Sequence, residues 1–297
     1  MGLGTARWRR GRWAAIVAAC LLAVTAAPPG AGADPAGPVH YVALGDSYTS
    51  GPGIPNQSTD APACRRSDHN YPHLVAAALA PGRFTDVSCA GATTDHMASP
   101  QPLAGGLSTA PQLDALDADA DLVSLGIGGN DIGFAEIAVT CAGLSVLFPI
   151  GAPCRHHYER HGDEVGTRLA AAAPKVAAVL AAIRDRAPAA RILLVGYPVI
   201  LPAGGPGCWP LMPIAVGDVD WLRGVEGRLN AMLADQAATV GATFVDTYTS
   251  SVGHDVCRLP GRKWVEGFVP TAPAGAVHPN ALGMANDAAR VLAALSN

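Results

Sequence analysis

The segment Tyr41-Val-Ala-Leu-Gly-Asp-Ser-Tyr-Thr-Ser-Gly51 changes from apolar to polar at its middle. Its first four residues form a strand-like run, and Gly45 follows at the point where a strand would end and the backbone would turn sharply. Ligands of open α/β sheets bind at the carboxyl ends of the strands. Ser47 therefore lies where a nucleophile is expected, although a single serine after a strand is more often a turn residue.

The rest of the chain alternates strand-like and helix-like segments, which implies βαβ units, a mainly parallel sheet and an α/β fold. Two apolar, Pro-containing segments, 134–154 and 198–217, fit neither pattern, and the second is too long for an ordinary loop. Proline 174 interrupts the longest helical pattern. Strands are predicted at 40–44, 84–89, 121–127, 191–195 and 242–246, and helices at 72–80, 110–116, 158–186, 219–240 and 279–295.

Three further motifs follow the first one in the chain: Ala90-Gly91-Ala92-Thr93, Gly128-Gly129-Asn130-Asp131 and Val277-His278-Pro279-Asn280. With Gly45-Asp46-Ser47-Tyr48 they resemble, in order, the four blocks of the SGNH (GDSL-type) hydrolase family, which contribute a Ser, a Gly, an Asn and a His. Each block alone is unspecific, but four in order over nearly the whole chain are specific. Six cysteines and Val245-Asp246-Thr247-Tyr248 make the chain similar to the secreted actinobacterial lipases and esterases of this family.

The resemblance implies a single domain with a three-layer α/β/α sandwich and a five-stranded, mainly parallel, flavodoxin-like sheet. It also implies a serine carboxylic-ester hydrolase with Ser47 as nucleophile and His278 as the base that removes its proton. The oxyanion hole would use the backbone N–H groups of Ser47 and Gly91 and the side-chain amide of Asn130. The motif is not the α/β-hydrolase nucleophile elbow, because Thr49 occupies the position where that elbow needs Gly.

The third member of a catalytic triad is missing from its usual place. Most of the family has Asp three residues before the His, and that position is Gly275 here, in a stretch without a carboxylate (272–277). Some of the secreted lipases that this chain resembles use a backbone carbonyl instead. We therefore expect a Ser47–His278 dyad in which the Gly275 carbonyl accepts the Nδ1 proton of His278. Asp246 or Asp255 reaching in from elsewhere is the alternative.

Residues 1–33 have the pattern of a secretory signal peptide. Four arginines precede the apolar run 13–27, and Ala31-Gly32-Ala33 forms an A-x-A cleavage site before Asp34. The run is short for a membrane span. Cys20 sits in a lipoprotein-like context, but the apolar run continues past it. We expect a secreted protein whose single domain comprises residues 34–297.

Six cysteines remain after the leader, and an even number in an exported chain indicates disulfides whose pairing the sequence leaves open. The resemblance suggests neighbour pairing: Cys64–Cys89, Cys141–Cys154 and Cys208–Cys257. Metal thiolates are disfavoured because no C-x-x-C pair is present. His69 and His73, which share a helical face, and the adjacent His156 and His157 lack a carboxylate cluster. No metal site and no cofactor are therefore predicted.

Charge and composition limit the partners. Removing residues 1–33 takes four of the 20 basic side chains and none of the 24 acidic ones. An acidic chain disfavours nucleic acid, and at most transient contact with a lipid surface is expected. We expect a monomer, with segments 134–154 and 198–217 either lining an acyl pocket or packing as ordinary loops.

The expected activity is lipase or esterase hydrolysis of acyl glycerols or similar lipid esters. A phospholipase A1 or a carbohydrate acetylesterase would use the same residues, and the sequence does not separate these activities. A secreted binding protein that kept the fold without catalysis is the alternative from another class. The complete Ser/Gly/Asn/His set argues against it.

Overall fold

The computed structural model describes residues 1–4 and 39–296. The predicted cleavage site before Asp34, Cys20 and nearly all of the predicted leader lie outside these residues. From residue 39 onward, the described chain belongs to one compact unit, Pro38–Asn297.

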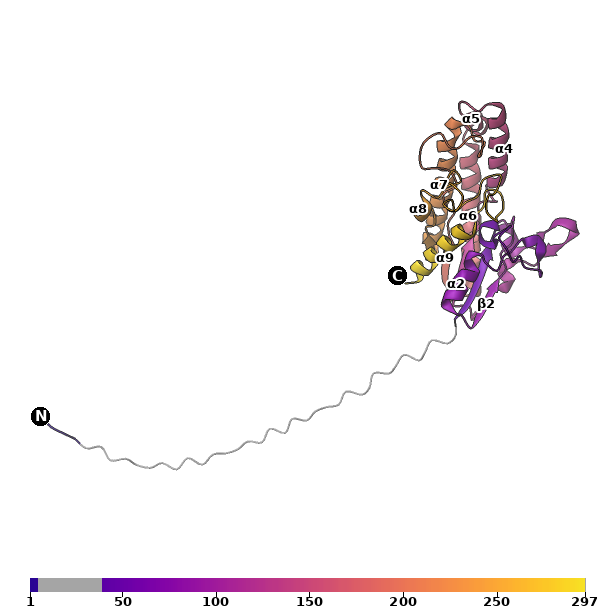
Figure 1. The fold of residues 1–297 in the computed structure, drawn as a ribbon. Coiled ribbons are helices and arrows are strands. Elements are labelled where there is room, and N and C mark those ends of the chain that lie inside the picture. Colours follow the sequence, from indigo (N-terminus) through magenta and orange to yellow (C-terminus); the bar gives the residue numbers. More distant parts are fainter. Residues whose placement is uncertain (5–38, 297) are drawn as a thin grey trace. The chain divides into compact units, whose positions relative to one another are not determined.

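Five strands form the central sheet, and every neighbouring pair is parallel (Figure 1). The order β2-β1-β5-β6-β7 is the flavodoxin-like order 2-1-3-4-5 when these five strands are counted along the chain. The predicted fold class is therefore confirmed. The strands are β1 (His40–Gly45), β2 (Arg83–Asp86), β5 (Leu122–Gly126), β6 (Arg191–Val195) and β7 (Thr243–Val245).

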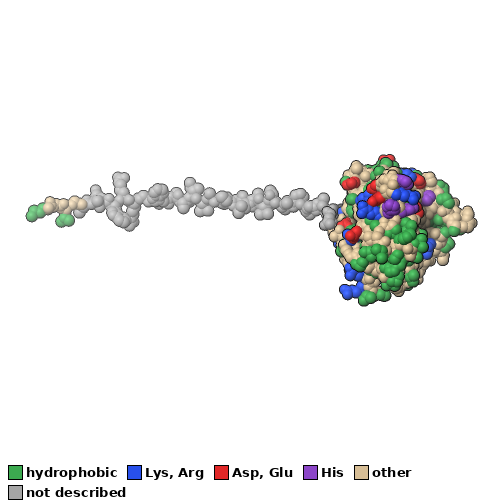
Figure 2. All heavy atoms as spheres, turned by 90° about the horizontal axis from the view of Figure 1, so that it is seen from above, with side chains coloured by type: hydrophobic (Ala, Val, Ile, Leu, Met, Phe, Trp, Pro, Cys, Tyr) green, Lys and Arg blue, Asp and Glu red, His purple; other side chains and the backbone are tan. Residues whose placement is uncertain are grey.

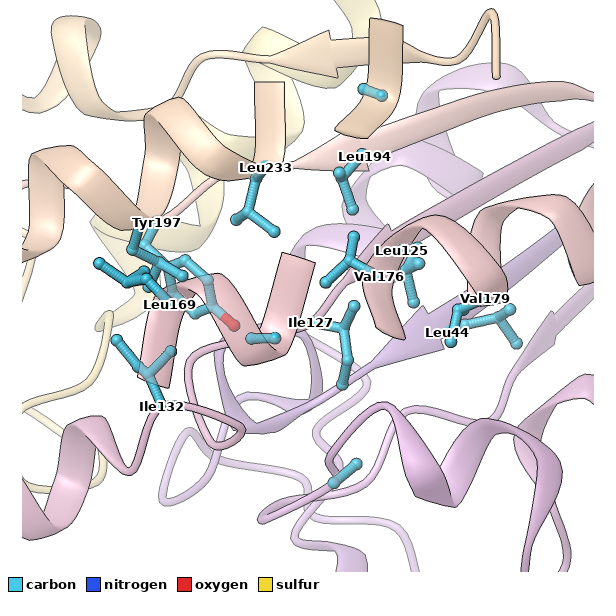
Figure 3. Close-up of a cluster of buried hydrophobic side chains, with 14 of the residues drawn as sticks. Leu44, Leu125, Ile127, Ile132, Leu169, Val176, Val179, Leu194, Tyr197 and Leu233 are labelled. Atoms are coloured by element: carbon cyan, nitrogen blue, oxygen red, sulfur yellow. The ribbon is translucent and has the colours of Figure 1, made fainter. Parts of the chain in front are cut away.

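Buried side chains alternate between the two faces of the sheet, as the period of two in a strand requires. In β1, Tyr41 and Ala43 join one apolar cluster, whereas Val42 and Leu44 join the other. Figure 3 shows part of the second cluster, with Leu44, Leu125 and Leu194 of neighbouring strands beside helical side chains. Because both faces are covered, the inner strands β1, β5 and β6 are largely apolar, whereas the edge strand β2 carries Arg83, Thr85 and Asp86.

Helices cover both faces of the sheet and complete three layers. Helices α2 (Tyr71–Leu79) and α9 (Ala281–Leu295) pack together on one face, and α6 (Glu164–Arg186) packs beside α7 (Val216–Thr239) on the other. Side-chain caps fix three of their starts, at Asn70, Asp163 and Asn280. Helices α4 (Phe134–Leu147) and α5 (Pro153–Glu159) lie toward the end of α6 and α7 that projects beyond the sheet (Figure 1).

Shorter elements fill the connections. The β3–β4 hairpin, which is antiparallel, has no counterpart in the sequence prediction, and the helix predicted at 110–116 is a single 3₁₀ turn. These elements are α1 (Ser47–Ser50), η1 (Pro62–Cys64), α3 (Asp95–Ala98), β3 (Gln101–Pro102), η2 (Ala104–Gly106), β4 (Ser108–Thr109), η3 (Gln112–Ala115) and α8 (Tyr248–Ser251).

The prediction that Pro174 interrupts a helix is wrong. Helix α6 runs through Pro174, and the break lies earlier, between Glu159 and Glu164, where Asp163 caps the new helix. A proline inside a helix costs about 3 kcal/mol. Burying side chains such as Leu169 and Leu180 contributes about 1.5–3 kcal/mol each, so the packed face outweighs that cost. Among the described helices, α6 alone is long and apolar enough to span a membrane. Its apolar face, which includes Leu169 and Leu180, packs into the core.

The cysteines pair as the resemblance suggested. Disulfides join Cys64 to Cys89, Cys141 to Cys154, and Cys208 to Cys257. The second of them ties α4 to α5, so the segment that had no clear assignment is a disulfide-linked helix pair.

Candidate active site

Ser47 is the first residue of α1, immediately after the turn that ends β1. Asp46 caps this short helix because its Oδ1 accepts the Tyr48 N–H at 2.8 Å. Gly45 has φ +151°, and a Cβ there would lie 2.2 Å from the Thr49 hydroxyl. The turn therefore requires glycine, and it places Ser47 at the carboxyl edge of the sheet.

His278 reaches Ser47 from the opposite end of the chain. Its Nε2 lies 2.8 Å from the Ser47 Oγ, which is hydrogen-bonding distance. The loop that carries His278 is fixed on both sides, because the His278 carbonyl accepts the Glu266 N–H and Asn280 donates its N–H to Trp264. The sequence prediction that these two side chains meet agrees with this geometry.

The other imidazole nitrogen does not contact the carbonyl that was predicted. Nδ1 of His278 lies 2.7 Å from the Ala276 oxygen, whereas the Gly275 oxygen accepts the His278 backbone N–H at 3.2 Å. The reason is the shape of the turn: Val277 has φ +58°, the conformation of the third residue in a type II turn. That turn reverses the peptide between Ala276 and Val277. The Gly275 prediction is corrected to Ala276.

Tyr48 holds this turn in place. Its hydroxyl donates to the Val277 carbonyl at 2.7 Å, and its ring lies 4.9 Å from the His278 ring, centroid to centroid. Positive φ is unfavourable for a β-branched residue such as Val277 and persists only where neighbours impose it. The residue after the proposed nucleophile thus positions the loop of the proposed base.

Neither alternative carboxylate contacts His278. Asp246 is exposed and caps the Thr249 N–H, and Asp255 is buried against the Arg258 guanidinium at 3.0 Å. Both therefore have structural partners. Burial lowers the pKa of His278 below its usual 6.5, the hydrogen bond to Ala276 raises it in part, and the Arg65 charge lowers it.

The three predicted oxyanion donors come from the ends of neighbouring strands. Asn130 uses one amide hydrogen on the Ala92 carbonyl at 2.8 Å, which leaves its second amide hydrogen available. Among the described residues, the N–H groups of Ser47 and Gly91 have no hydrogen-bond acceptor. Asn130 lines the same cavity as Ser47 and His278, whereas Gly91 is exposed after β2 and is not part of the cavity wall. Their oxyanion roles remain predictions.

Tyr197 joins two of the motifs, and the sequence interpretation missed it. Its hydroxyl donates to the Asp46 Oδ2 at 2.6 Å and accepts the Gly129 N–H at 2.8 Å. A Cβ on Gly129 would lie 3.0 Å from the Tyr197 ring, which explains the glycine. Burial raises the pKa of Asp46 to about 7, against the opposing effect of the Tyr197 hydrogen bond. The signal available in the sequence was the position of Tyr197, two residues beyond the end of β6.

A second link joins the Gly91 and Asn130 motifs. Asp131 accepts the Thr94 N–H at 3.1 Å and also the Thr94 hydroxyl. Asp46 and Asp131 thus both have structural partners, because each accepts a backbone N–H. Within residues 1–4 and 39–296, no group of three His, Cys, Asp or Glu side chains is arranged to hold a metal ion.

An apolar cavity of about 250 Å³ opens beside Ser47 and His278. Segment 134–154 supplies Phe134, Ala138 and Val139 to its wall, and segment 198–217 supplies Ile200. Of the two alternatives left open for these segments, the structure shows that both contribute to a cavity wall. Phe268 and Leu229 also line it.

Comparisons with known proteins agree with this geometry. A model of the GDSL-like Lipase/Acylhydrolase family matches residues 43–285. Lipase 2 of Streptomyces coelicolor is 40% identical over 248 residues, covering 82% of this chain and 81% of that protein. The Streptomyces rimosus lipase is 34% identical over 286 residues, covering 93% and 95%.

Two solved structures have the same fold over most of the chain. The phospholipase A1 of Streptomyces albidoflavus NA297 has a TM-score of 0.72 at 28% identity, and the extracellular lipase of Streptomyces rimosus has 0.71 at 30%. Each comparison covers 86% of this chain and 99% of the other. The chain belongs to the GDSL-like lipase/acylhydrolase family and is a carboxylic-ester hydrolase.

Proposed function

We propose that this protein is a secreted lipase or esterase that works through a Ser47–His278 dyad. The observation that carries the proposal is the 2.8 Å contact between Ser47 Oγ and His278 Nε2. Neutral His278 takes the Ser47 proton while Oγ attacks the ester carbonyl, and then gives that proton to the leaving alcohol. Water hydrolyses the acyl-enzyme by the same route in reverse.

The Ala276 carbonyl takes the position that a carboxylate has in a conventional triad. It accepts the Nδ1 proton of His278, which fixes the tautomer with Nε2 free to accept from Ser47. A carbonyl carries only a partial charge, so it stabilises the imidazolium less than an aspartate would. The Ser47 and Gly91 N–H groups and the Asn130 amide stabilise the negative oxygen of the tetrahedral intermediate.

The substrate proposal rests on the cavity. An apolar space of about 250 Å³ beside Ser47 suits a medium or longer acyl chain better than an acetyl group, which would leave most of it empty. Acyl glycerols or similar lipid esters are the favoured substrates. Phospholipase A1 activity is the second candidate, supported by the structural similarity to the Streptomyces albidoflavus enzyme of that name.

Export is supported by three features. The chain begins with a basic region, an apolar run and an A-x-A site, and the folded part carries three disulfides. The similar Streptomyces rimosus lipase is described as extracellular.

A fluorophosphonate probe tests the nucleophile. We expect one covalent adduct on Ser47 in the oxidised, folded protein, and loss of both adduct and ester hydrolysis in Ser47→Ala. Rates over a series of acyl esters and a phosphatidylcholine then separate lipase from phospholipase activity. An unlabelled Ser47 in folded protein that still hydrolyses esters would contradict the proposed nucleophile.

The dyad makes a separate prediction for Asp246. Because its carboxylate caps Thr249 and does not contact His278, Asp246→Asn should leave kcat within about 2-fold of the wild type. A conventional triad member would lose about 10⁴-fold on the same change. A loss of that size, in a variant with unchanged thermal stability, would restore Asp246 to the catalytic machinery.

A further inference from the structure

The solvent-facing side of α4 is apolar after its first turn, in which the exposed Glu136 pairs with Arg168. Helical spacing places residues 135, 136, 139, 143, 146 and 147 on this side, and all of them are exposed. The loop after the helix continues the same surface. We use "apolar ridge" for its large side chains, which keep between 60% and 87% of their surface accessible: Val139, Val146, Leu147, Phe148 and Ile150.

The apolar ridge is continuous with the candidate active site. Val139 belongs to the ridge and also lines the cavity beside Ser47. The sequence from Ile137 to Cys154, which contains all of the apolar ridge, has no charged residue. An exposed apolar surface of this kind, joined to a substrate cavity, marks a contact site for another apolar phase.

The fold holds the ridge loop in its exposed position. The Cys141–Cys154 disulfide closes the loop, and Gly217 donates its N–H to the Gly151 carbonyl at 2.8 Å. The fully buried carboxylate of Asp218 accepts the backbone N–H groups of Cys154 and Arg155 at 2.9 and 2.8 Å. The apolar side chains are therefore presented to solvent by a braced structure.

A cationic rim follows the ridge directly. In α5 and the turn after it, Arg155, His156, Arg160 and His161 are exposed, and Arg155 pairs with the exposed Glu159 at 2.8 Å. A polar hollow of about 290 Å³ lies here, with Arg160 and His161 on its wall together with Asp163 and Glu164. Figure 2, which views the molecule from the α4–α5 end, shows hydrophobic side chains gathered beside histidine and basic side chains.

We propose that the apolar ridge and the cationic rim dock the enzyme on a zwitterionic phospholipid surface. Ridge side chains enter the acyl-chain region, while the rim donates N–H groups to lipid phosphates. Asp163 and Glu164 in the same hollow pair with Arg228 and Arg168, and their exposed carboxylates also suit the amine end of a zwitterionic headgroup. Docking in this orientation brings the cavity mouth to the lipid, so the inference rests on the proposed ester-hydrolase function.

Vesicle co-sedimentation tests the ridge. Two proteins are mixed with phosphatidylcholine vesicles: the Ser47→Ala protein, which leaves the lipid intact, and a variant of it that also carries Leu147→Ser and Ile150→Ser. We expect the two ridge substitutions to weaken vesicle binding at least ~30-fold, because two large apolar side chains are no longer transferred from water into the lipid. Leu107→Ser is the matched control, since this leucine is also 60% exposed but lies near the β3–β4 hairpin. Equal binding by ridge and control variants would overturn the proposal.

A second comparison tests the rim. Arg160→Gln should lower binding to phosphatidylcholine vesicles several-fold and leave adsorption to a triacylglycerol emulsion unchanged. Equal loss on both surfaces would overturn the phosphate contact. Sedimentation velocity of the protein without lipid tests whether a second copy of the chain covers the ridge instead. A dimer that Ile150→Ser dissociates would also overturn lipid docking.

A soluble short-chain ester separates the two proposals. The ridge variants with Ser47 intact should hydrolyse it at the wild-type rate, because Leu147 and Ile150 do not line the cavity. Absence of hydrolysis by the wild type would refute the proposed function. Vesicle binding by the Ser47→Ala protein does not depend on hydrolysis, so it tests the docking proposal separately.

Discussion

His278 is subject to opposing influences on its imidazole, and they set the pH range in which it can act as a base. Burial lowers its pKa below 6.5, the Ala276 carbonyl raises it in part, and the positive charge of Arg65 lowers it. Within the part of the chain that the structure describes, no carboxylate contacts the ring to raise the pKa as in a conventional triad. The proposed dyad would therefore stabilise the imidazolium less than a conventional triad does, and its base would stay neutral to a lower pH.

This balance predicts the acid limb of the pH profile. Only neutral His278 can accept the Ser47 proton, so a lowered pKa means that activity persists below pH 6.5 and is lost as the imidazole becomes protonated. The measurement is kcat/KM on a soluble ester from about pH 4 to pH 8. Arg65→Gln should move the limb to higher pH. A midpoint above 6.5, or no acid limb, would contradict His278 as the base.

At the scale of elements, Tyr197 connects the ends of three adjacent strands. It follows β6, its hydroxyl bonds Asp46 after β1, and it accepts the Gly129 N–H after β5. The proposed nucleophile and the proposed oxyanion amide come from different strands, and their relative position depends on such cross-links. Tyr197 is thus a positioning residue.

Tyr197→Phe should lower both stability and turnover. It leaves the buried Gly129 N–H without an acceptor, which costs about 1–3 kcal/mol of unfolding free energy. Because Asn130 follows Gly129, we expect kcat to fall about 10-fold or more, with a smaller change in KM.

The control is Tyr158→Phe, at a tyrosine that is 2% exposed and whose hydroxyl has no partner among the described residues. It should leave both kcat and stability nearly unchanged. If Tyr197→Phe lowered stability but left kcat at the wild-type value, Tyr197 would be structural only.

What the sequence could predict at this scale was local. Apolar runs bounded by Gly and Pro located all five strands of the main sheet, and ordered motifs identified Ser47 and His278. The Ala276 carbonyl was missed by one residue because a turn with positive φ at Val277 reverses the peptide, and valine gives no signal for that turn. Tyr197 was missed because its partners are 68 and 151 residues away.

At the scale of the whole molecule, the sheet separates two apolar clusters, and an ionisable group beside one of them makes stability depend on pH. Asp287 is 3% exposed on the buried side of α9, whose neighbours Met284, Ala288 and Val291 belong to the smaller cluster. Burial raises its pKa to about 8, and the hydrogen bond from Asn286 opposes this only in part. The folded protein therefore holds a neutral carboxyl group near neutral pH.

The sign of the resulting pH effect follows from linkage. The folded pKa of about 8 lies above the unfolded value of 3.8, so the protonated form stabilises the fold fully below 3.8. This contribution is lost as pH rises toward 8, with a slope of up to about 1.4 kcal/mol per pH unit. Asp287→Asn, which mimics the neutral acid, should remove the slope that this residue causes.

Urea unfolding at about pH 5, 6.5 and 8 measures the effect, with the unfolding free energy compared at each pH. The unfolding free energy of Asp287→Asn should exceed that of the wild type by an amount that grows with pH and reaches a few kcal/mol at pH 8. Asp46, whose pKa burial raises to about 7, adds a slope of the same sign to both proteins and cancels in the comparison. The exposed Asp235→Asn serves as the control and should show no growing difference. Parallel curves for wild type and Asp287→Asn would show that α9 does not bury a neutral acid.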